Sequence, residues 1–271
     1  MAEFRRKFLQ GSLLLASQAV LNGLAWGQPA ALRLAVHPYA GALSLANTYR
    51  PLQQYLEKSL QRPIEFYTAA GFDAYVTSLM AGEYDIAITP PHFAVLAIDK
   101  GYTPLFHFQT LLEPVLAVQD GSNIRGLNEL RGRRIAMADK SAFIRIVIMR
   151  WLSDNGLTAG KEFEIIERPT HAASATAVLA GEADAGLTTT TAAAQMAPDL
   201  KKQLFLLSPG LRFPHLFTLA HRRLGSEGIE RLREALKHFD ARQPLAREFF
   251  AASAFGGYEA VTEEDVRRIK P

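Results

Sequence analysis

The chain has 271 residues, of which 48% are apolar and 21% charged, and it contains no cysteine. This composition suits one large or two medium globular domains and excludes a disordered, collagen-like or coiled-coil chain. The missing cysteines exclude disulfides, thiolate catalysis and cysteine-ligated metal clusters. The formal net charge of +3 would favour a nucleic-acid or membrane partner only if the working part of the chain carried it.

The beginning of the chain has the pattern of an export signal. A basic stretch at residues 5–7 precedes a weakly apolar run at about residues 13–25, which is too short and too polar to span a bilayer. Small residues follow, so we expect a signal peptide over residues 1–27, cleaved after Gly27. Its paired arginines resemble a twin-arginine signal, and an ordinary Sec signal is the alternative. Either route predicts a periplasmic protein.

Cleavage of this signal would remove most of the positive charge. The whole chain has 30 basic and 27 acidic residues, and the signal holds three basic residues and one acidic residue. The mature chain therefore has 27 basic and 26 acidic residues, a net charge of +1. Its basic stretch at Arg131–Arg134 is interrupted by Gly132. We therefore predict no nucleic-acid partner.

Short apolar runs alternate with amphipathic stretches along the rest of the chain. We predict strands at residues 32–37, 63–68, 84–89, 103–108, 114–118, 134–138, 163–167, 184–188, 204–207 and 216–220. We predict helices at residues 44–60, 72–81, 91–99, 141–155 and 171–180, and three charged helices near 226–239, 244–252 and 262–269. This alternation predicts an α/β fold with mixed, mostly parallel sheets.

A repeated segment predicts two similar lobes. Residues 80–89 read MAGEYDIAIT, and residues 179–188, ninety-nine positions later, read LAGEADAGLT. Each copy joins a helix end, a glycine cap, an aspartate before a strand and a threonine at the end of that strand. The shared composition of helix–glycine–strand junctions is the alternative explanation.

The predicted lobes are interleaved along the chain. We assign residues 28–115 and 214–271 to lobe 1 and residues 116–213 to lobe 2. The crossover near residues 112–119 and the return near residues 207–220 are apolar and contain proline and glycine, as paired hinge strands would.

Four loops are candidates for a binding site. Ligands of open α/β sheets bind beyond the carboxyl ends of the strands. The loops at these ends are His37–Gly41, Thr89–His92, Asp139–Ala142 and Thr188–Thr191. Each leads into a helix N-terminus, where free N–H groups and the helix dipole favour an anion. If the lobes face each other, the loops form one cleft for a small anionic or polar ligand.

Several residues near these loops have both a structural and a ligand-binding interpretation. Ser141 can cap the following helix or contact a ligand, and the threonines at residues 188–191 can do either. Arg145 lies in a nearly apolar helix, so its buried guanidinium needs an anion. Either a carboxylate elsewhere in the chain or an oxyanion ligand would supply that charge.

The sequence has no catalytic or metal-binding signature. Its seven histidines never occur at HxH, HxxxH or HExxH spacing, and no GxSxG, Walker A or GxGxxG motif is present. His37, His92, His171 and His215 do lie near predicted strand ends or helix starts, where an assembled site remains an alternative. We predict no cofactor, no metal and no enzymatic activity.

Four markers resemble the periplasmic solute-binding proteins of the phosphate/phosphite/phosphonate group, which serve ABC transporters. They are Gly71–Tyr75, Tyr84–Ala87, Gly126–Ala136 and the placement of His171 thirteen residues before Asp184. The resemblance covers about residues 31–240. It implies a two-lobed, type II periplasmic-binding-protein fold, with two hinge strands and a ligand between the lobes.

The resemblance also implies a phosphoryl oxyanion and the positions that hold it. The family's aromatic residue at the start of a first-lobe helix matches Phe72, which lacks a hydroxyl, and its strand-end residue matches Thr89. Of the family's hydroxyl run before a second-lobe helix only Ser141 is kept, followed by Ala142, and the family's histidine matches His171. The family's acidic residue for an amino group is missing between residues 211 and 215.

These observations lead to one preferred function. We predict an exported, monomeric binding protein that captures a small oxyanion and presents it to a membrane ABC permease or a sensor kinase. The predicted ligand-binding residues are Tyr39, Phe72, Thr89, His92, Ser141, Ala142, Arg145, His171, Thr188 and Thr189. The alternatives are a periplasmic enzyme acting on a small anionic substrate, and the sensing half of a regulator, which would normally need a helix-turn-helix segment on the same chain.

Overall fold

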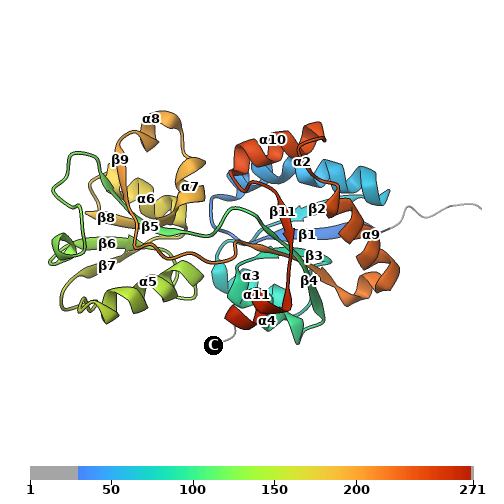
Figure 1. Cartoon of the computed structure of the whole chain (residues 1–271), viewed down its shortest axis with the longest axis horizontal. Helices are drawn as coiled ribbons and strands as arrows, with labels where there is room; N and C mark the ends of the chain where they lie inside the picture. The colour runs from blue at the N-terminus through green and yellow to red at the C-terminus, as the bar shows by residue number, and fades with distance from the viewer. Residues whose placement is uncertain (1–29, 270–271) are drawn as a thin grey trace, which may run out of the picture. The chain divides into compact units, whose positions relative to one another are not determined.

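A computed structural model describes residues 30–269 of the chain (Figure 1). They form an α/β fold with two sheets, each at the centre of one lobe. The predicted signal peptide lies outside the described residues. Within residues 30–269, no helix is long and apolar enough to cross a membrane.

The first lobe is built on a six-stranded sheet with strand order β11-β4-β10-β3-β1-β2. Its strands are β1 (Leu32–Val36), β2 (Ile64–Tyr67), β3 (Ile86–Thr89), β4 (Tyr102–Phe108), β10 (Phe217–His221) and β11 (Tyr258–Ala260). Its helices are α2 (Ala42–Leu60), α3 (Phe72–Met80), α4 (Pro91–Ile98), α9 (Gly225–Lys237), α10 (Pro244–Ser253) and α11 (Glu263–Ile269). A 3₁₀ turn, η2 (Arg222–Leu224), precedes α9.

The second lobe is built on a five-stranded sheet with strand order β7-β6-β8-β5-β9. Its strands are β5 (Pro114–Gln119), β6 (Arg134–Met137), β7 (Glu164–Glu167), β8 (Ala185–Thr189) and β9 (Leu204–Leu207). Its helices are α5 (Phe143–Asp154), α6 (His171–Leu179), α7 (Thr190–Ala194) and α8 (Pro198–Lys201), with the 3₁₀ turn η1 (Asn128–Leu130).

The predicted strands and helices are all present, with boundaries that differ by a few residues. The sequence did not predict β11, α7 or α8. Strand β11 has three residues and pairs antiparallel with the edge of β4, so a tertiary contact creates it. Helix α7 begins with threonines, whose branched side chains disfavour helix on propensity alone.

Both sheets are mixed because the chain crosses between them twice. Strand β5 enters the second sheet antiparallel to β8 and β9, and β10 returns to the first sheet antiparallel to β3 and β4. The remaining neighbours, apart from the edge strand β11, pair in parallel. The predicted mixed fold is therefore confirmed, although four strand pairs are parallel and five antiparallel, so parallel pairs are not the majority expected. The residues at which the lobes divide stay a prediction.

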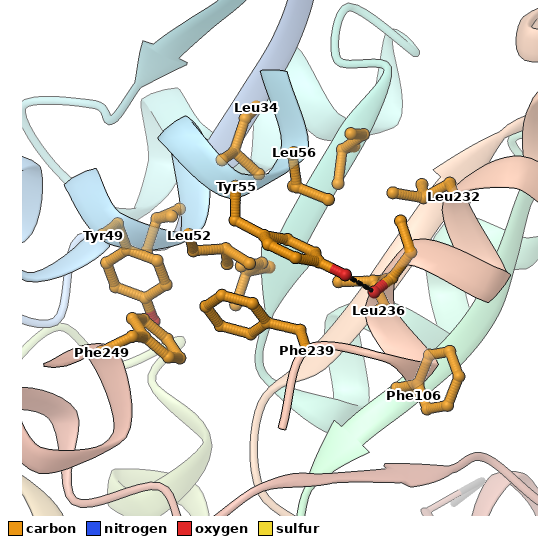
Figure 2. Close-up of a cluster of buried hydrophobic side chains, with 14 of the residues drawn as sticks. Leu34, Tyr49, Leu52, Tyr55, Leu56, Phe106, Leu232, Leu236, Phe239 and Phe249 are labelled. Carbon is orange, nitrogen blue, oxygen red and sulfur yellow. Dashed lines mark hydrogen bonds between the residues drawn. The ribbon is translucent and has the colours of Figure 1, made fainter. Parts of the chain in front are cut away.

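The central strands are buried on both faces, and alternate residues pack in different cores. In β1, Leu34 and Val36 pack in a cluster with α2, α9 and α10, whereas Ala35 packs in a cluster with α3 and α4. Figure 2 shows the first of these clusters, in which the Tyr55 hydroxyl donates to the carbonyl of Ala235 at 2.9 Å. This bond satisfies a buried polar group and joins α2 to α9.

The repeated segment has the same structure in both lobes. Asp85 accepts a hydrogen bond from the backbone N–H of Arg33 at 2.8 Å, and Asp184 accepts one from the backbone N–H of Arg134 at 2.8 Å. Gly82 and its counterpart Gly181 adopt φ values of 72° and 71°, a conformation that glycine favours. Each carboxylate thus ties a helix–strand junction to the neighbouring parallel strand.

We predict that Gly186→Ala destabilises the second lobe. A Cβ at Gly186 in β8 would lie 2.1 Å from the carbonyl oxygen of Ser174 in α6, so the helix would have to move away from the sheet. We expect a loss of about 2 kcal/mol or more in the free energy of unfolding, measured by urea denaturation. The control is Gly41→Ala, where no atom lies within 4 Å of the added carbon. Equal stability of the two variants would contradict this packing.

Candidate functional site

The two lobes belong to one compact unit that begins at Ala31, and they touch across a small cavity. The His92 Nε2–H of α4 donates to the carbonyl of Ser141 at 2.9 Å, and the ring of His92 stacks on that of Phe143 at 5.3 Å. Phe72 of the first lobe is buried against Ala138 and Ala142 of the second. These contacts describe a closed arrangement.

The cavity lies at the carboxyl ends of β1, β3 and β8, where the sequence predicted the cleft. Its volume is about 30 Å³. It is lined by His37, Tyr39, Pro90, Leu112, Phe143, Ile144, His171, Thr189, Thr191, Ala192, His215, Leu216 and Phe255. None of these thirteen residues is Lys, Arg, Asp or Glu, so the described lining carries no fixed formal charge.

Two histidines from different lobes meet at the cavity, and Phe72 packs beside both rings. The ring centroids of His37 and His171 are 6.5 Å apart, and Phe72 packs edge-on against them at 4.5 and 5.8 Å. In each imidazole, Nδ1 is buried with no hydrogen-bond partner among the described residues. A buried lone pair without a partner costs less free energy than a buried N–H without an acceptor. We therefore place the proton of the neutral ring on Nε2 of both histidines.

Burial keeps these rings uncharged. It lowers the pKa of His171 to about 4. It also lowers the pKa of His37 well below the usual 6.5, and electrostatic repulsion from His171 and His92 lowers that pKa further. Burial also lowers the pKa of His92 to about 4. The imidazoles therefore offer neutral N–H donors at neutral pH.

Hydroxyl groups form a second polar part of the cavity. The Oγ1 atoms of Thr189 and Thr191 are 3.0 Å apart, and Thr191 Oγ1 lies 3.0 Å from His215 Nε2. Thr189 also caps α7, because its Oγ1 accepts from the backbone N–H of Ala192 at 3.0 Å. Of the two interpretations of the threonine run, capping therefore applies to Thr189, which lines the cavity as well.

The predicted site residues fall into four groups. Tyr39, His171 and Thr189 line the cavity. The contact between the lobes is made by His92, Ser141, Ala142 and Phe72. Thr89 and Thr188 are buried, and their Oγ1 atoms lack a hydrogen-bond partner within the described chain. Arg145 does not line the cavity.

Ser141 does not cap a helix, contrary to one of its two predicted roles. Helix α5 begins at Phe143 with Ala142 at the cap position and no side-chain cap bond. The Ser141 hydroxyl and backbone N–H instead donate to Asp139 Oδ1 at 2.6 and 2.8 Å. A carboxylate two residues earlier is the stronger acceptor, so it holds Ser141 in a turn before the helix.

Arg145 has a carboxylate partner within the chain. Its guanidinium donates to both carboxylate oxygens of Glu167 at 2.6 and 2.8 Å and to the carbonyl of Ala138 at 2.6 Å. The charge that α5 buries is therefore neutralised by β7, and no ligand is needed for it. Of the two anions that the sequence left open, the structure contains the carboxylate.

The sequence did not single out most of the apolar lining or the partner of Thr191. Among the other lining residues, His37 and Pro90 lie in predicted site loops. His37 and His215 also lie near predicted strand ends. Leu112, Phe143, Ile144, Leu216 and Phe255 form an apolar wall. They carry no signal in the sequence that distinguishes them from core residues.

The chain is similar to known proteins in both sequence and structure. A sequence model described as an ABC transporter, phosphonate, periplasmic substrate-binding protein matches residues 34–266. A phosphate-import protein, PhnD, from Mycolicibacterium smegmatis is 27% identical over 182 residues. That match covers 59% of this chain and only 55% of the relative.

Two solved structures have the same fold. PhnD1 from Prochlorococcus marinus, solved with methylphosphonate, superposes with a TM-score of 0.76 at 17% identity, covering 88% of this chain and 95% of that one. A binding protein component of a phosphonate ABC transporter from Pseudomonas aeruginosa gives a TM-score of 0.78 at 16% identity, covering 89% and 84%. Both are two-lobed type II binding proteins, so the predicted fold class is confirmed.

We predict that Glu167→Gln lowers stability without changing ligand affinity. The substitution leaves the guanidinium of Arg145, whose side chain is 10% exposed, without a counter-charge. We expect a loss of about 1 kcal/mol in the free energy of unfolding, because Glu167 itself is largely exposed to solvent. Glu164→Gln, at an exposed position at the start of the same strand, is the control. A weaker ligand affinity in Glu167→Gln alone would instead place Arg145 in the binding site.

Proposed function

The chain belongs to the periplasmic substrate-binding proteins of phosphonate ABC transporters, and from this premise we propose that it captures a small oxyanion of the phosphate, phosphite or phosphonate type. The family is one of binding proteins, so the enzyme alternative is set aside. The observation that carries the proposal is the cavity between the lobes, which combines neutral hydrogen-bond donors with an apolar wall and has no carboxylate in its described lining.

Hydrogen bonds and a proton can balance the charge of an oxyanion in this cavity. The Nε2–H groups of His37 and His171 come from opposite lobes, so closure brings both donors to one ligand. His171 is also the first residue of α6, and Phe143 is the first residue of α5. The N-terminal dipoles of these helices favour negative charge at the same place.

The apolar wall restricts which substituent the ligand can have on phosphorus. A hydrogen or a small alkyl group bonded to phosphorus would meet Leu112, Phe143 and Phe255 without loss of hydrogen bonds. An ammonium group there would be desolvated without a counter-ion. We therefore propose an unsubstituted oxyanion or a short alkylphosphonate as the ligand.

The biological context of this binding follows from the family. We propose that the protein works as a monomer in the periplasm and delivers its ligand to a membrane ABC permease. A sensor kinase is the alternative recipient. Export through the twin-arginine route, with removal of residues 1–27, stays part of the proposal, and the Sec route is its alternative.

We predict that methylphosphonate binds at least about tenfold more tightly than 2-aminoethylphosphonate, because burial of an unpaired ammonium costs well over 1 kcal/mol. Isothermal titration calorimetry on the mature protein measures both affinities. Ethylphosphonate is the matched control, since it has the chain length without the charge. Preferential binding of the amino compound would contradict the proposed ligand class.

We predict that ligand binding takes up protons at His171. In the closed, ligand-free protein burial lowers the pKa of His171 to about 4, so closure has no protonation cost above about pH 6.5 and becomes less favourable as the pH falls from 6.5 toward 4. A bound anion favours the protonated ring and raises that pKa, so binding near pH 6.5 should consume protons.

Calorimetry in two buffers of different ionisation enthalpy measures this uptake. His171→Gln should take up fewer protons than the wild type with methylphosphonate, and the ligand's own titration is common to both proteins. His238→Gln, at an exposed position after α9, is the control. Equal uptake by the wild type and His171→Gln would exclude His171 as the proton acceptor.

A further inference from the structure

Thr189, Thr191 and His215 form a hydrogen-bonded chain along one wall of the cavity. The three side chains are buried, with 5%, 4% and 3% of their surface exposed, and successive polar atoms are 3.0 Å apart. The threonines belong to the second lobe, and His215 lies on the segment that returns to β10. The direction of the hydrogens along this chain decides what the wall offers to a ligand.

A backbone group fixes the direction at His215. The N–H of Leu216 donates to His215 Nδ1 at 2.8 Å. An amide N–H can only donate, so Nδ1 carries a lone pair and the proton of the neutral ring is on Nε2. Burial, with a smaller effect of His107, lowers the pKa of His215 to about 3, which keeps the ring neutral. Nε2–H therefore donates to the hydroxyl oxygen of Thr191.

The hydroxyl hydrogens can then be counted. Thr189 and Thr191 have one each, and one of these spans the 3.0 Å between the two oxygens. Thr189 Oγ1 accepts from the N–H of Ala192, and Thr191 Oγ1 accepts from His215, so neither contact uses the second hydrogen. That hydrogen is left for the cavity. With the opposite tautomer, Nε2 would accept from Thr191, Thr191 from Thr189, and no hydroxyl hydrogen would remain.

We propose that His215 is a positioning residue that makes the Thr189–Thr191 pair a hydrogen-bond donor toward the ligand. The bonds to His215, Ala192 and each other then leave the two hydroxyls one hydrogen and one lone pair, whereas the opposite tautomer of His215 would leave no hydrogen. The wall can therefore donate a hydrogen bond to a ligand oxygen. The inference rests on the proposed function and adds that a deprotonated oxygen of the oxyanion lies against this wall.

Nitrogen-15 NMR of the histidine-labelled, ligand-free protein tests the direction of the chain. At about pH 7 the ring of His215 should be neutral, with its hydrogen on Nε2 and none on Nδ1. The His215→Phe spectrum identifies its signals by their disappearance. A hydrogen on Nδ1, or a doubly protonated ring, would overturn the inference without any reference to a ligand.

Two isosteric ligands test the consequence for binding. At about pH 5, below the second pKa of a phosphoryl group, methylphosphonate is a monoanion with one O–H, whereas methanesulfonate is a monoanion with none. Because charge and shape are matched, the ratio of their affinities reports hydrogen-bond direction. Wild type should bind methanesulfonate at least about as tightly as methylphosphonate, since each oxygen of methanesulfonate can accept the hydrogen that the wall donates.

The variant His215→Phe should move this ratio. Without the imidazole N–H, the oxygen of Thr191 is free to accept from the ligand, so methylphosphonate should gain about 5- to 10-fold relative to methanesulfonate. His107→Phe, the same change at a buried histidine outside the cavity lining, should leave the ratio unchanged.

The outcomes separate this inference from the proposed function. Tight binding of methylphosphonate by the wild type with rejection of methanesulfonate, or an unchanged ratio in His215→Phe, would overturn the inference and leave the function standing. Failure of the wild type to bind phosphate, methylphosphonate and methanesulfonate at any pH tested would contradict both.

Discussion

The imidazoles of His37 and His171 are buried and that of His92 is partly buried where the lobes meet, and the chemistry of the cavity depends on this burial. It keeps the rings neutral by lowering each pKa, and it leaves Nδ1 of each ring enclosed without a partner among the described residues. A cavity built in this way can meet an anion with N–H groups, helix dipoles and a proton taken up on binding. Such a cavity can bind an anion without an arginine. Arg145 of α5, which the sequence offered for this role, forms an ion pair with Glu167.

The scaffold brings these groups together through repeated, close-packed junctions. Two similar helix–glycine–strand segments place a threonine at the end of β3 and of β8, next to the meeting point of the lobes. In the second lobe, Gly186 lets the backbone of α6 approach β8, which sets the position of His171 relative to Thr189. A shift of α6 would therefore separate the imidazole from the hydroxyl pair.

The sequence predicted the fold well because the signals were local. Short apolar runs, glycine caps and charged helices mark their elements by composition, and the repeat indicated two lobes before any contact was known. Two of the elements that it did not predict depend on specific contacts. Strand β11 forms by pairing with β4, and helix α7 is capped by Thr189. Propensity does not contain that information.

The candidate site was predicted less completely, for a physical reason. Loop positions follow from topology, so the neighbourhood of Tyr39, His171 and Thr189 could be predicted. Partner choice does not follow from topology. The carboxylate that neutralises Arg145 of α5 lies 22 residues away on strand β7, and the hydrogen bond between Thr191 and His215 joins residues 24 positions apart. Such pairings are seen only in the three-dimensional structure.

The central claim is that an oxyanion is held between the lobes by imidazole and hydroxyl donors, without a lysine or an arginine. A crystal structure of the mature protein with methylphosphonate tests this most directly. The account predicts the phosphonate oxygens within hydrogen-bond distance of Nε2 of His171 and of a hydroxyl of Thr189 or Thr191, with the methyl group against Phe143 and Leu112. A phosphonate bound by a lysine or arginine, or bound outside the cavity, would contradict it.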